Sequence, residues 1–127
     1  MRIAQITDLH LRHFLPGTCP VTARLGRMMP DLLPQALEQI KKQQVDVLVV
    51  TGDLLDVPGW VENLPRGFEV DDNQLWAEAA AKDYRLIKKM LDDSRLEYMV
   101  LPGNHDLPQA MWQVFDQKDY QKKLAVI

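Results

Sequence analysis

Three short groups of acidic, amide and imidazole side chains are the residues of this sequence best suited to chemistry. They are Asp8-Leu9-His10, Gly52-Asp53 and Gly103-Asn104-His105-Asp106. Carboxylate and amide oxygens combined with imidazole nitrogens suit manganese, iron, zinc or cobalt better than calcium. Two such ions roughly 3.5–4 Å apart can hold a phosphoryl group, lower the pKa of a shared water and stabilise an in-line displacement. The three groups therefore predict a centre of two divalent ions.

Each residue type suggests a different place at such a centre. Asp8 and His10 are two residues apart, so on an extended backbone their side chains point the same way and can share one ion. Asp53 has two carboxylate oxygens with which it can bridge both ions. Asn104 offers a carbonyl oxygen to the second ion, whereas the next residue, His105, points elsewhere and is available to a substrate.

The three groups follow three segments that predict β-strands. Residues 2–7, 46–51 and 97–101 are short and mostly apolar, and the continuous apolar run 47–50 is typical of a strand buried on both faces of a parallel sheet. Apolar residues at helical spacing mark the segments between them. They are Leu33, Leu37 and Ile40 in the first segment, and Trp76, Ala80, Tyr84, Ile87 and Leu91 in the second.

Two prolines help to place the helices. Pro34 suits only a first turn, so the first helix is expected to begin close before it. Pro108 is expected to open a third helix, whose apolar residues Met111, Val114 and Phe115 pack inward. Strands that alternate with helices predict an α/β fold with a mostly parallel sheet and flanking helices. Because ligands bind at the carboxyl ends of strands in such sheets, the three groups should meet there.

Length and composition limit the classes of function. The chain has 127 residues, which fits one domain at 1–127, and its 15 Lys+Arg against 18 Asp+Glu give a net charge of −3. Without a positive excess, an extended nucleic acid is a disfavoured partner. No apolar run is long enough to span a membrane, and the N-terminus lacks the pattern of a signal peptide, so a cytoplasmic location is expected. A lone cysteine, Cys19, excludes an intrachain disulfide and is expected to be inert.

The three groups resemble the first three motifs of the calcineurin-like metallophosphoesterases. The stretches 2–10 and 49–56 are similar to the cyclic-nucleotide-phosphodiesterase-like branch of that family. The resemblance implies a β-sandwich flanked by helices in four layers, a dinuclear centre and the hydrolysis of phosphomonoesters or phosphodiesters, with a small molecule or nucleotide as substrate. It also implies that His105 acts as a proton donor or phosphate-binding group, oriented by Asp106. By motif position, the metal ligands implied are Asp8, His10, Asp53 and Asn104.

The chain departs from the family pattern after residue 106. The family continues with two further histidine motifs, but the histidines here are His10, His13 and His105. We therefore expect an incomplete domain that corresponds to the first half of the sandwich. The first ion has three protein ligands and the second only Asp53 and Asn104, so the second ion should be weakly held and activity impaired. A half-sandwich also exposes apolar sheet surface, which favours dimerisation, strand exchange or aggregation, and a homodimer covering that surface is one expected partner.

Several residues have a second interpretation. The segment 11–30 is basic and without acids, and its Arg12 is the first candidate to clamp a substrate phosphate, although a solvated arginine is the alternative. Asp106 also suits the N-cap of the helix that begins near Pro108. Asp56 is interpreted as a turn or cap residue and His13 as solvated surface. Trp76 and Tyr84 are expected in the core, and the long connections 11–30 and 54–73 are candidates for function.

Two other functions compete with phosphoester hydrolysis on the same fold. A non-catalytic scaffold would offer the fold as a protein-binding surface, but it has no need of His105 beside Asp53. A nuclease would act on DNA, against which the acidic net charge counts. A small receiver-like domain would need an acidic pair at the end of the first strand, where this chain has Asp8 and His10.

Overall fold

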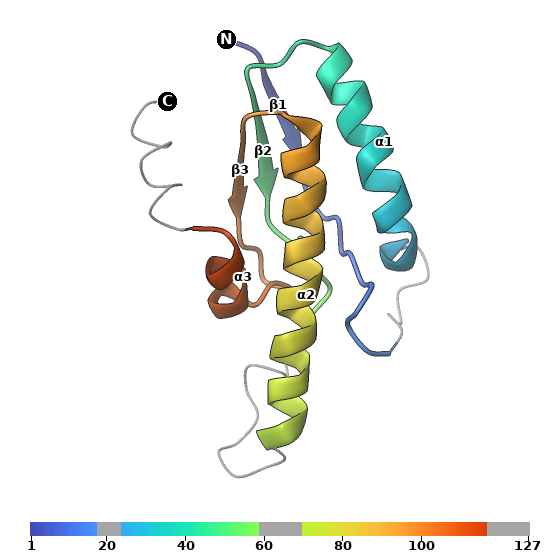
Figure 1. The fold of residues 1–127 in the computed structure, drawn as a ribbon, viewed down its shortest axis with the longest axis vertical. Coiled ribbons are helices and arrows are strands. Elements are labelled where there is room, and N and C mark those ends of the chain that lie inside the picture. Colours follow the sequence, from blue (N-terminus) through green and yellow to red (C-terminus); the bar gives the residue numbers. More distant parts are fainter. Residues whose placement is uncertain (18–23, 59–69, 117–127) are drawn as a thin grey trace.

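A three-stranded parallel sheet forms the centre of the molecule, with helices packed against it (Figure 1). The computed structural model describes residues 1–17, 24–58 and 70–116. Strands and helices alternate along these residues, which confirms the predicted α/β class. The elements are β1 (Ile3–Ile6), the short 3-10 helix η1 (Gly26–Met28), α1 (Met29–Lys42), β2 (Val47–Thr51), α2 (Val70–Ser94), β3 (Tyr98–Leu101) and α3 (Pro108–Val114).

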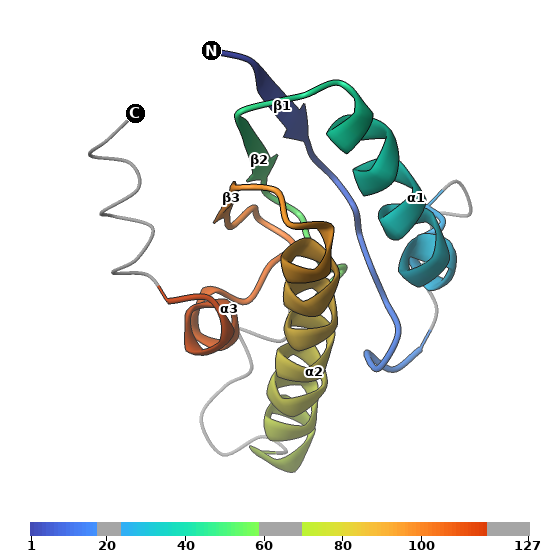
Figure 2. The same cartoon turned by 45° about the horizontal axis from the view of Figure 1, so that its top comes forward.

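The strands lie in the order β1-β2-β3, and both neighbouring pairs are parallel (Figure 2). Ile3 pairs with Val47, and Leu48 pairs with Tyr98. Each predicted strand is present within one residue of its expected bounds. Because all three strands run in the same direction, their carboxyl ends lie at one edge of the sheet, where the three polar groups follow.

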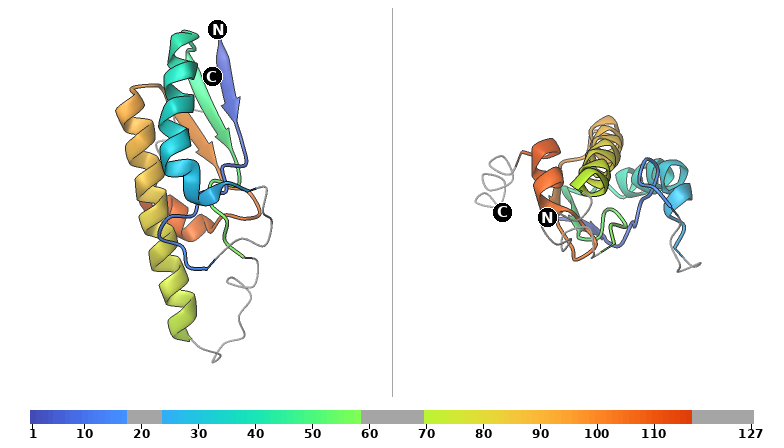
Figure 3. Two further views of the ribbon diagram at one scale, coloured as in Figure 1. Left: turned by 90° about the vertical axis from the view of Figure 1, so that its right-hand side faces the viewer. Right: turned by 90° about the horizontal axis from the view of Figure 1, so that it is seen from below.

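Helices α1 and α2 cover the same face of the sheet (Figure 3). On this face Leu48, Val50 and Val100 are fully buried, and they join the core formed with the apolar sides of the helices. On the opposite face Ile3 is 56% exposed and Leu101 is 42% exposed. This exposure agrees with the expected apolar surface, and a homodimer that covers it stays a prediction.

Helix α1 begins earlier than the sequence predicts. It starts at Met29 with Pro30 in the first turn, and Pro34 lies inside the helix rather than at its start. The prediction was wrong because either proline can occupy a first turn, and the structure uses Pro30 there. Leu33 and Leu37, on either side of Pro34, are each 2% exposed, so burial of this apolar side opposes the cost of the internal proline.

The other two helices follow their predicted patterns. Tyr84, Ile87 and Leu91 of α2 are fully buried, and Trp76 is partly buried against them. Helix α3 begins at Pro108 as predicted, and Met111 and Phe115 are fully buried while Val114 is partly buried. None of the helices among the described residues combines the length and the apolar character needed to cross a membrane. Cys19 lies outside the described residues, as do Trp60 and Phe68 of the long connection 54–73.

Candidate metal centre

Backbone pairing continues past the ends of β1 and β2 and brings the first two polar groups together. The amide of Asp8 donates to the carbonyl of Gly52 at 3.2 Å, and that of His10 donates to the carbonyl of Asp53 at 2.9 Å. One residue further on, Leu11 forms an isolated parallel bridge with Leu55. The segment after β1 therefore runs beside the segment after β2, and the two are held in a fixed register.

The side chains of Asp8, His10 and Asp53 converge, but not on the extended backbone that was expected. All three residues have positive φ angles, 57° at Asp8, 45° at His10 and 50° at Asp53. His10 Nε2 lies 3.4 Å from Asp8 Oδ1 and 3.8 Å from Asp53 Oδ2. Local left-handed backbone, which costs energy in residues other than glycine, accompanies this convergence.

The third polar group reaches the same place through two glycines. Gly52 and Gly103 lie against each other, and a Cβ on Gly103 would collide with the backbone nitrogen and the carboxylate of Asp53. The amide of His105 donates to Asp53 Oδ1 at 2.9 Å. Asn104 precedes this amide and is exposed. The loop after β3 thus contacts the carboxylate expected to bridge two ions.

Asp106 connects the loops behind the centre. Its carboxylate accepts hydrogen bonds from the amides of Leu54, Leu55 and Gly103 and from the hydroxyl of Tyr84. Burial raises the pKa of Asp106, although these hydrogen bonds oppose the rise. The N-cap interpretation was wrong, because Leu107 occupies the N-cap of α3 and Asp106 binds other loops. Its contacts are those of a residue that fixes the positions of its neighbours.

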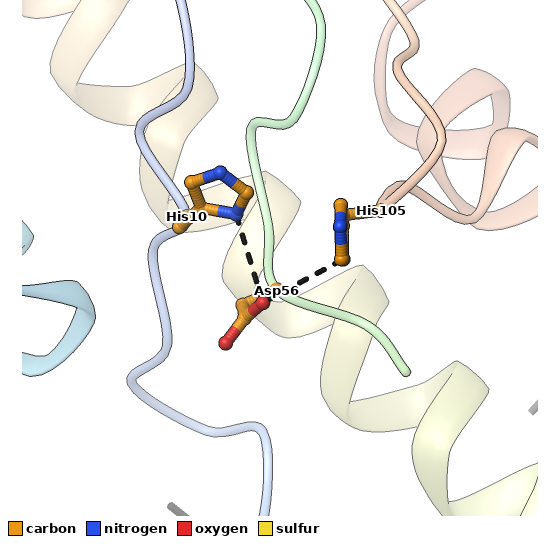
Figure 4. Close-up of side chains that lie close together, drawn as sticks. All are labelled: His10, Asp56 and His105. Atoms are coloured by element: carbon orange, nitrogen blue, oxygen red, sulfur yellow. Dashed lines mark ion pairs between the residues drawn. The ribbon is translucent and has the colours of Figure 1, made fainter. Parts of the chain in front are cut away.

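Asp56 is the functional candidate that sequence reasoning undervalued. Its Oδ1 lies 3.6 Å from His10 Nδ1 and 3.7 Å from His105 Nδ1, so one carboxylate faces both imidazoles (Figure 4). The two rings are 5.2 Å apart at their centroids in an edge-to-face arrangement. A weak signal was present in the sequence, because the segment 11–30 carries arginines and no acid, so any carboxylate that pairs with them comes from elsewhere.

The arginines of that basic segment are directed at protein groups. Arg12 is 5% exposed and donates to Asp56 Oδ2 at 3.0 Å, and Arg24 donates to Asp56 Oδ1 at 2.9 Å. Arg27 donates to the carbonyls of His13, Leu15 and Gly17. Direct contact of Arg12 with a substrate stays a prediction, and its observed contacts support a positioning role instead.

His13 lies apart from the two groups of candidate ligands. It is exposed, its ring contacts Phe14 edge-to-face at 4.6 Å, and its amide donates to Asp83. The groups that are compact enough for an ion are Asp8, His10 and Asp53, and His10, Asp56 and His105, among the residues described. The placement of His13 agrees with its interpretation as surface.

The first of these groups fits a divalent ion. Ligand atoms about 2.1 Å from one ion lie roughly 3–3.5 Å apart, close to the spacing around His10 Nε2. Two carboxylates and one imidazole also make a donor set suited to manganese, iron, zinc or cobalt. The hydrogen bond from the Thr7 hydroxyl has the largest effect on the pKa of Asp8 and lowers it. Burial opposes this effect, and contacts with Asp53 and His10 lower the pKa further. These contacts favour the ionised form of Asp8, which is the form that binds a cation.

Comparison with known proteins places this fold and its motifs in one family. The family model of the calcineurin-like phosphoesterases matches residues 1–126. A probable cyclic nucleotide phosphodiesterase from Fibrobacter succinogenes is 25% identical over 119 residues, which are 94% of this chain and 36% of the relative.

A solved structure shares the fold. The crystal structure of a dimetal phosphatase from Danio rerio is similar with a TM-score of 0.54 and 20% identity, over 81% of this chain and 29% of that one. The chain thus spans about a third of the length of these similar proteins. On the match of the family model over nearly its full length, the chain belongs to the calcineurin-like phosphoesterases.

Proposed function

We propose that this chain supplies the metal-binding part of a phosphoester hydrolase that acts on phosphodiesters or phosphomonoesters. The observation that carries the proposal is the convergence of Asp8, His10 and Asp53 at the carboxyl ends of parallel strands in a member of this family. The two similar proteins are named as a phosphodiesterase and a phosphatase, so both ester classes are candidates. A small phosphoester or a nucleotide is the substrate that we propose.

Asp8, His10 and Asp53 would hold the first ion, and Asp53 and Asn104 the second. When bound, two divalent ions acidify a water and neutralise charge on a phosphoryl group. Manganese, iron, zinc and cobalt all suit these ligands. The amide of His105 donates to Asp53 Oδ1, which fixes the carboxylate so that Oδ2 faces His10 Nε2.

His105 has the exposure that a group acting on substrate needs. Its side chain is 30% exposed, whereas that of His10 is 9% exposed. We assign to His105 the transfer of a proton to the alcohol oxygen that leaves as water forms the new bond to phosphorus, or the binding of the phosphoryl oxygens. Asp106 would support this role indirectly, by fixing the loop that carries His105.

The unequal ligand sets predict an order of filling. Calorimetric titration of this chain with Mn²⁺ should show one tighter site and one weaker site, because the second site shares a ligand with the first. Asp53→Ala should abolish the weaker site and weaken the tighter one. Asp46 is an acidic residue before the amino end of β2, so Asp46→Ala is the matched control and should bind Mn²⁺ as the unmodified chain does. Two equally tight sites would contradict the proposed ligand sets.

Hydrolysis of a nitrophenyl phosphodiester with added Mn²⁺ tests the reaction itself. We expect a slow rate from this chain that is lost in Asp53→Ala and kept in Asp46→Ala. Equal rates for the chain and Asp53→Ala would remove this centre as the source of activity. The same pair of measurements separates the scaffold alternative, which predicts neither metal binding at these residues nor hydrolysis.

A further inference from the structure

Asp56 faces the ring nitrogen of His10 that does not face the other two proposed metal ligands. Its carboxylate is 6% exposed and is approached by Arg12, Arg24, His10 and His105. It comes from the segment after β2, whereas the groups around it come from the segments after β1 and β3. One buried charge therefore meets groups from all three loops at this edge of the sheet.

Arg12 fixes the orientation of this carboxylate. One guanidinium nitrogen of Arg12 donates both to Asp56 Oδ2 at 3.0 Å and to the main-chain carbonyl of Asp56 at 2.8 Å. The other terminal nitrogen donates to the carbonyl of Pro16 at 2.8 Å, so the guanidinium is itself held. With Oδ2 bound in this way, Oδ1 faces both imidazoles, and it also accepts from Arg24 at 2.9 Å.

His10 presents a different nitrogen to each side. Its Nε2 faces Asp8 and Asp53, and its Nδ1 faces Asp56 Oδ1 at 3.6 Å. This Nδ1 is buried and has no hydrogen-bond partner at the observed distance. A small movement of the two groups toward each other would form a hydrogen bond. A hydrogen bond at one ring nitrogen of a histidine decides which of the two nitrogens carries the proton.

We propose that Asp56, oriented by Arg12, is a positioning residue that keeps the proton of His10 on Nδ1 and leaves Nε2 free for a metal. The inference rests on the proposed function in one respect: the ion at Nε2 of His10 is the proposed first ion. The arrangement of the proton is a property of the metal-free protein and can be measured there.

An ion bound by His10, Asp56 and His105 themselves is the competing use of the same atoms. Two guanidinium groups already lie within hydrogen-bond distance of Asp56, and they would repel a dication at that carboxylate. The same cations do not oppose an N–H donor on His10. The charges around Asp56 therefore favour a hydrogen-bond acceptor over a metal ligand.

The test is the nitrogen NMR spectrum of the imidazoles in metal-free protein at about pH 8, above the ordinary histidine pKa of about 6.5. The chain has three histidines, and the signals of His13 and His105 can be assigned with His13→Gln and His105→Gln, which leaves those of His10. We expect the shifts of His10 to show a protonated Nδ1 and an unprotonated Nε2. A proton on Nε2 in the unmodified chain would overturn the inference without any variant.

Asp56→Asn is the informative substitution because the two arginines that contact Asp56 differ in exposure. The side chain of Arg12, on Oδ2, is 6% exposed, whereas that of Arg24, on Oδ1, is 28% exposed and can turn to solvent when an amide replaces the carboxylate. The amide oxygen would face Arg12, which places the NH2 group toward His10 Nδ1. A donor there favours an unprotonated Nδ1, so we expect the proton to move to Nε2. Asp83→Asn is the matched control, since Asp83 is a fully buried carboxylate that binds the amides of residues 13–15 and should leave His10 unchanged.

Metal affinity supplies the second measurement. Calorimetry with Mn²⁺ should show the tighter site weakened by about 10- to 100-fold in Asp56→Asn, the range found for residues behind metal ligands. If the proton moves but neither protein binds Mn²⁺, the proposed function fails and the role of Asp56 in placing the proton stands. If the unmodified chain binds Mn²⁺ and Asp56→Asn binds it equally well, the positioning role is wrong and the proposed function stands.

Discussion

The two ends of the sheet use the same costly backbone conformation for different purposes. At the amino end, the residues other than glycine that have positive φ in the described part of the chain are Gln44 at 54° and Arg95 at 60°. At the carboxyl end they are Asp8, His10 and Asp53. The left-handed region costs non-glycine residues about 1–2 kcal/mol each, so both ends contain strain that the rest of the fold must offset.

At the amino end the strain serves only to reverse the chain. Gln44 follows the C-cap of α1, and Arg95 follows the last residue of α2. Both side chains are exposed, and a strand begins within a few residues. A left-handed residue is a common way to end a helix, and glycine is the usual choice. At the carboxyl end the same conformation occurs at the residues whose side chains converge, so there it cannot be exchanged for glycine without losing chemistry.

Asp8→Gly tests the difference between the two ends of the sheet and has the largest expected effect on Mn²⁺ affinity. Glycine relieves the strain at φ 57° but removes a carboxylate from the first proposed metal site. We expect Mn²⁺ affinity to fall on the order of a hundredfold or more, at least the loss typical of residues behind a metal ligand. Thermal unfolding in the absence of metal should change little. Unchanged Mn²⁺ affinity by calorimetry would show that the strain at Asp8 has no part in metal binding.

Gly103→Ala tests whether the carboxyl end depends on close approach of the loops. The added methyl group would overlap the backbone nitrogen and carboxylate of Asp53, so the loop must move. We expect a loss of about 2–3 kcal/mol in the free energy of unfolding, measured with urea, and weaker Mn²⁺ binding. Gly17→Ala is the control, because the methyl group there meets only the end of the Arg12 side chain. Its φ of 74° predicts a cost of about 1–2 kcal/mol, with metal binding retained. Equal effects of the two variants on Mn²⁺ affinity would contradict the role of close approach.

Tyr84→Phe and Tyr98→Phe make the same change near opposite ends of the sheet. The Tyr84 hydroxyl donates to buried Asp106 at 2.8 Å and accepts from the amide of partly buried Leu107 at 2.9 Å. We expect its loss to cost about 1–3 kcal/mol because a buried carboxylate and an amide lose a partner. The Tyr98 hydroxyl donates to Asp92, whose side chain is 48% exposed, so water can replace it at a cost below about 1 kcal/mol. Urea unfolding that ranks the two variants in reverse would refute this difference between the ends.

Sequence patterns were sufficient for the parts of the fold that depend on burial. The strands, the apolar side of α2 and the start of α3 follow from periodicity and from Pro108, because burial of apolar side chains is local in pattern. The start of α1 did not follow, since Pro30 and Pro34 both suit a first turn and only packing decides between them.

The proposed metal ligands could be predicted from the sequence, but the contacts of Asp56 and Asp106 around them could not. Asp8, His10 and Asp53 do lie together, yet their left-handed backbone could not be predicted, because aspartate and histidine adopt it more often than most residues but still in a small minority of cases. The contacts of Asp56 with Arg12 and Arg24 link segments more than thirty residues apart. Two of the amides bound by Asp106, those of Leu54 and Leu55, belong to another loop. Such contacts depend on how loops pack, which a pattern of residue types does not encode.

Arg95→Gly tests the strain at the amino end of the sheet and should produce the smallest effect. Arg95 is exposed at φ 60°, so glycine removes strain of about 1–2 kcal/mol and adds about 0.4–1 kcal/mol of conformational entropy to the unfolded chain. The balance predicts a gain of about 0.5–1 kcal/mol in the free energy of unfolding. Mn²⁺ affinity should not change, because the residue lies at the end of the sheet away from the metal ligands. A loss of stability on urea unfolding would mean that the left-handed conformation of Arg95 is not a site of strain. The strain that only reverses the chain at the amino end could then no longer be contrasted with the strain that places ligands at the carboxyl end.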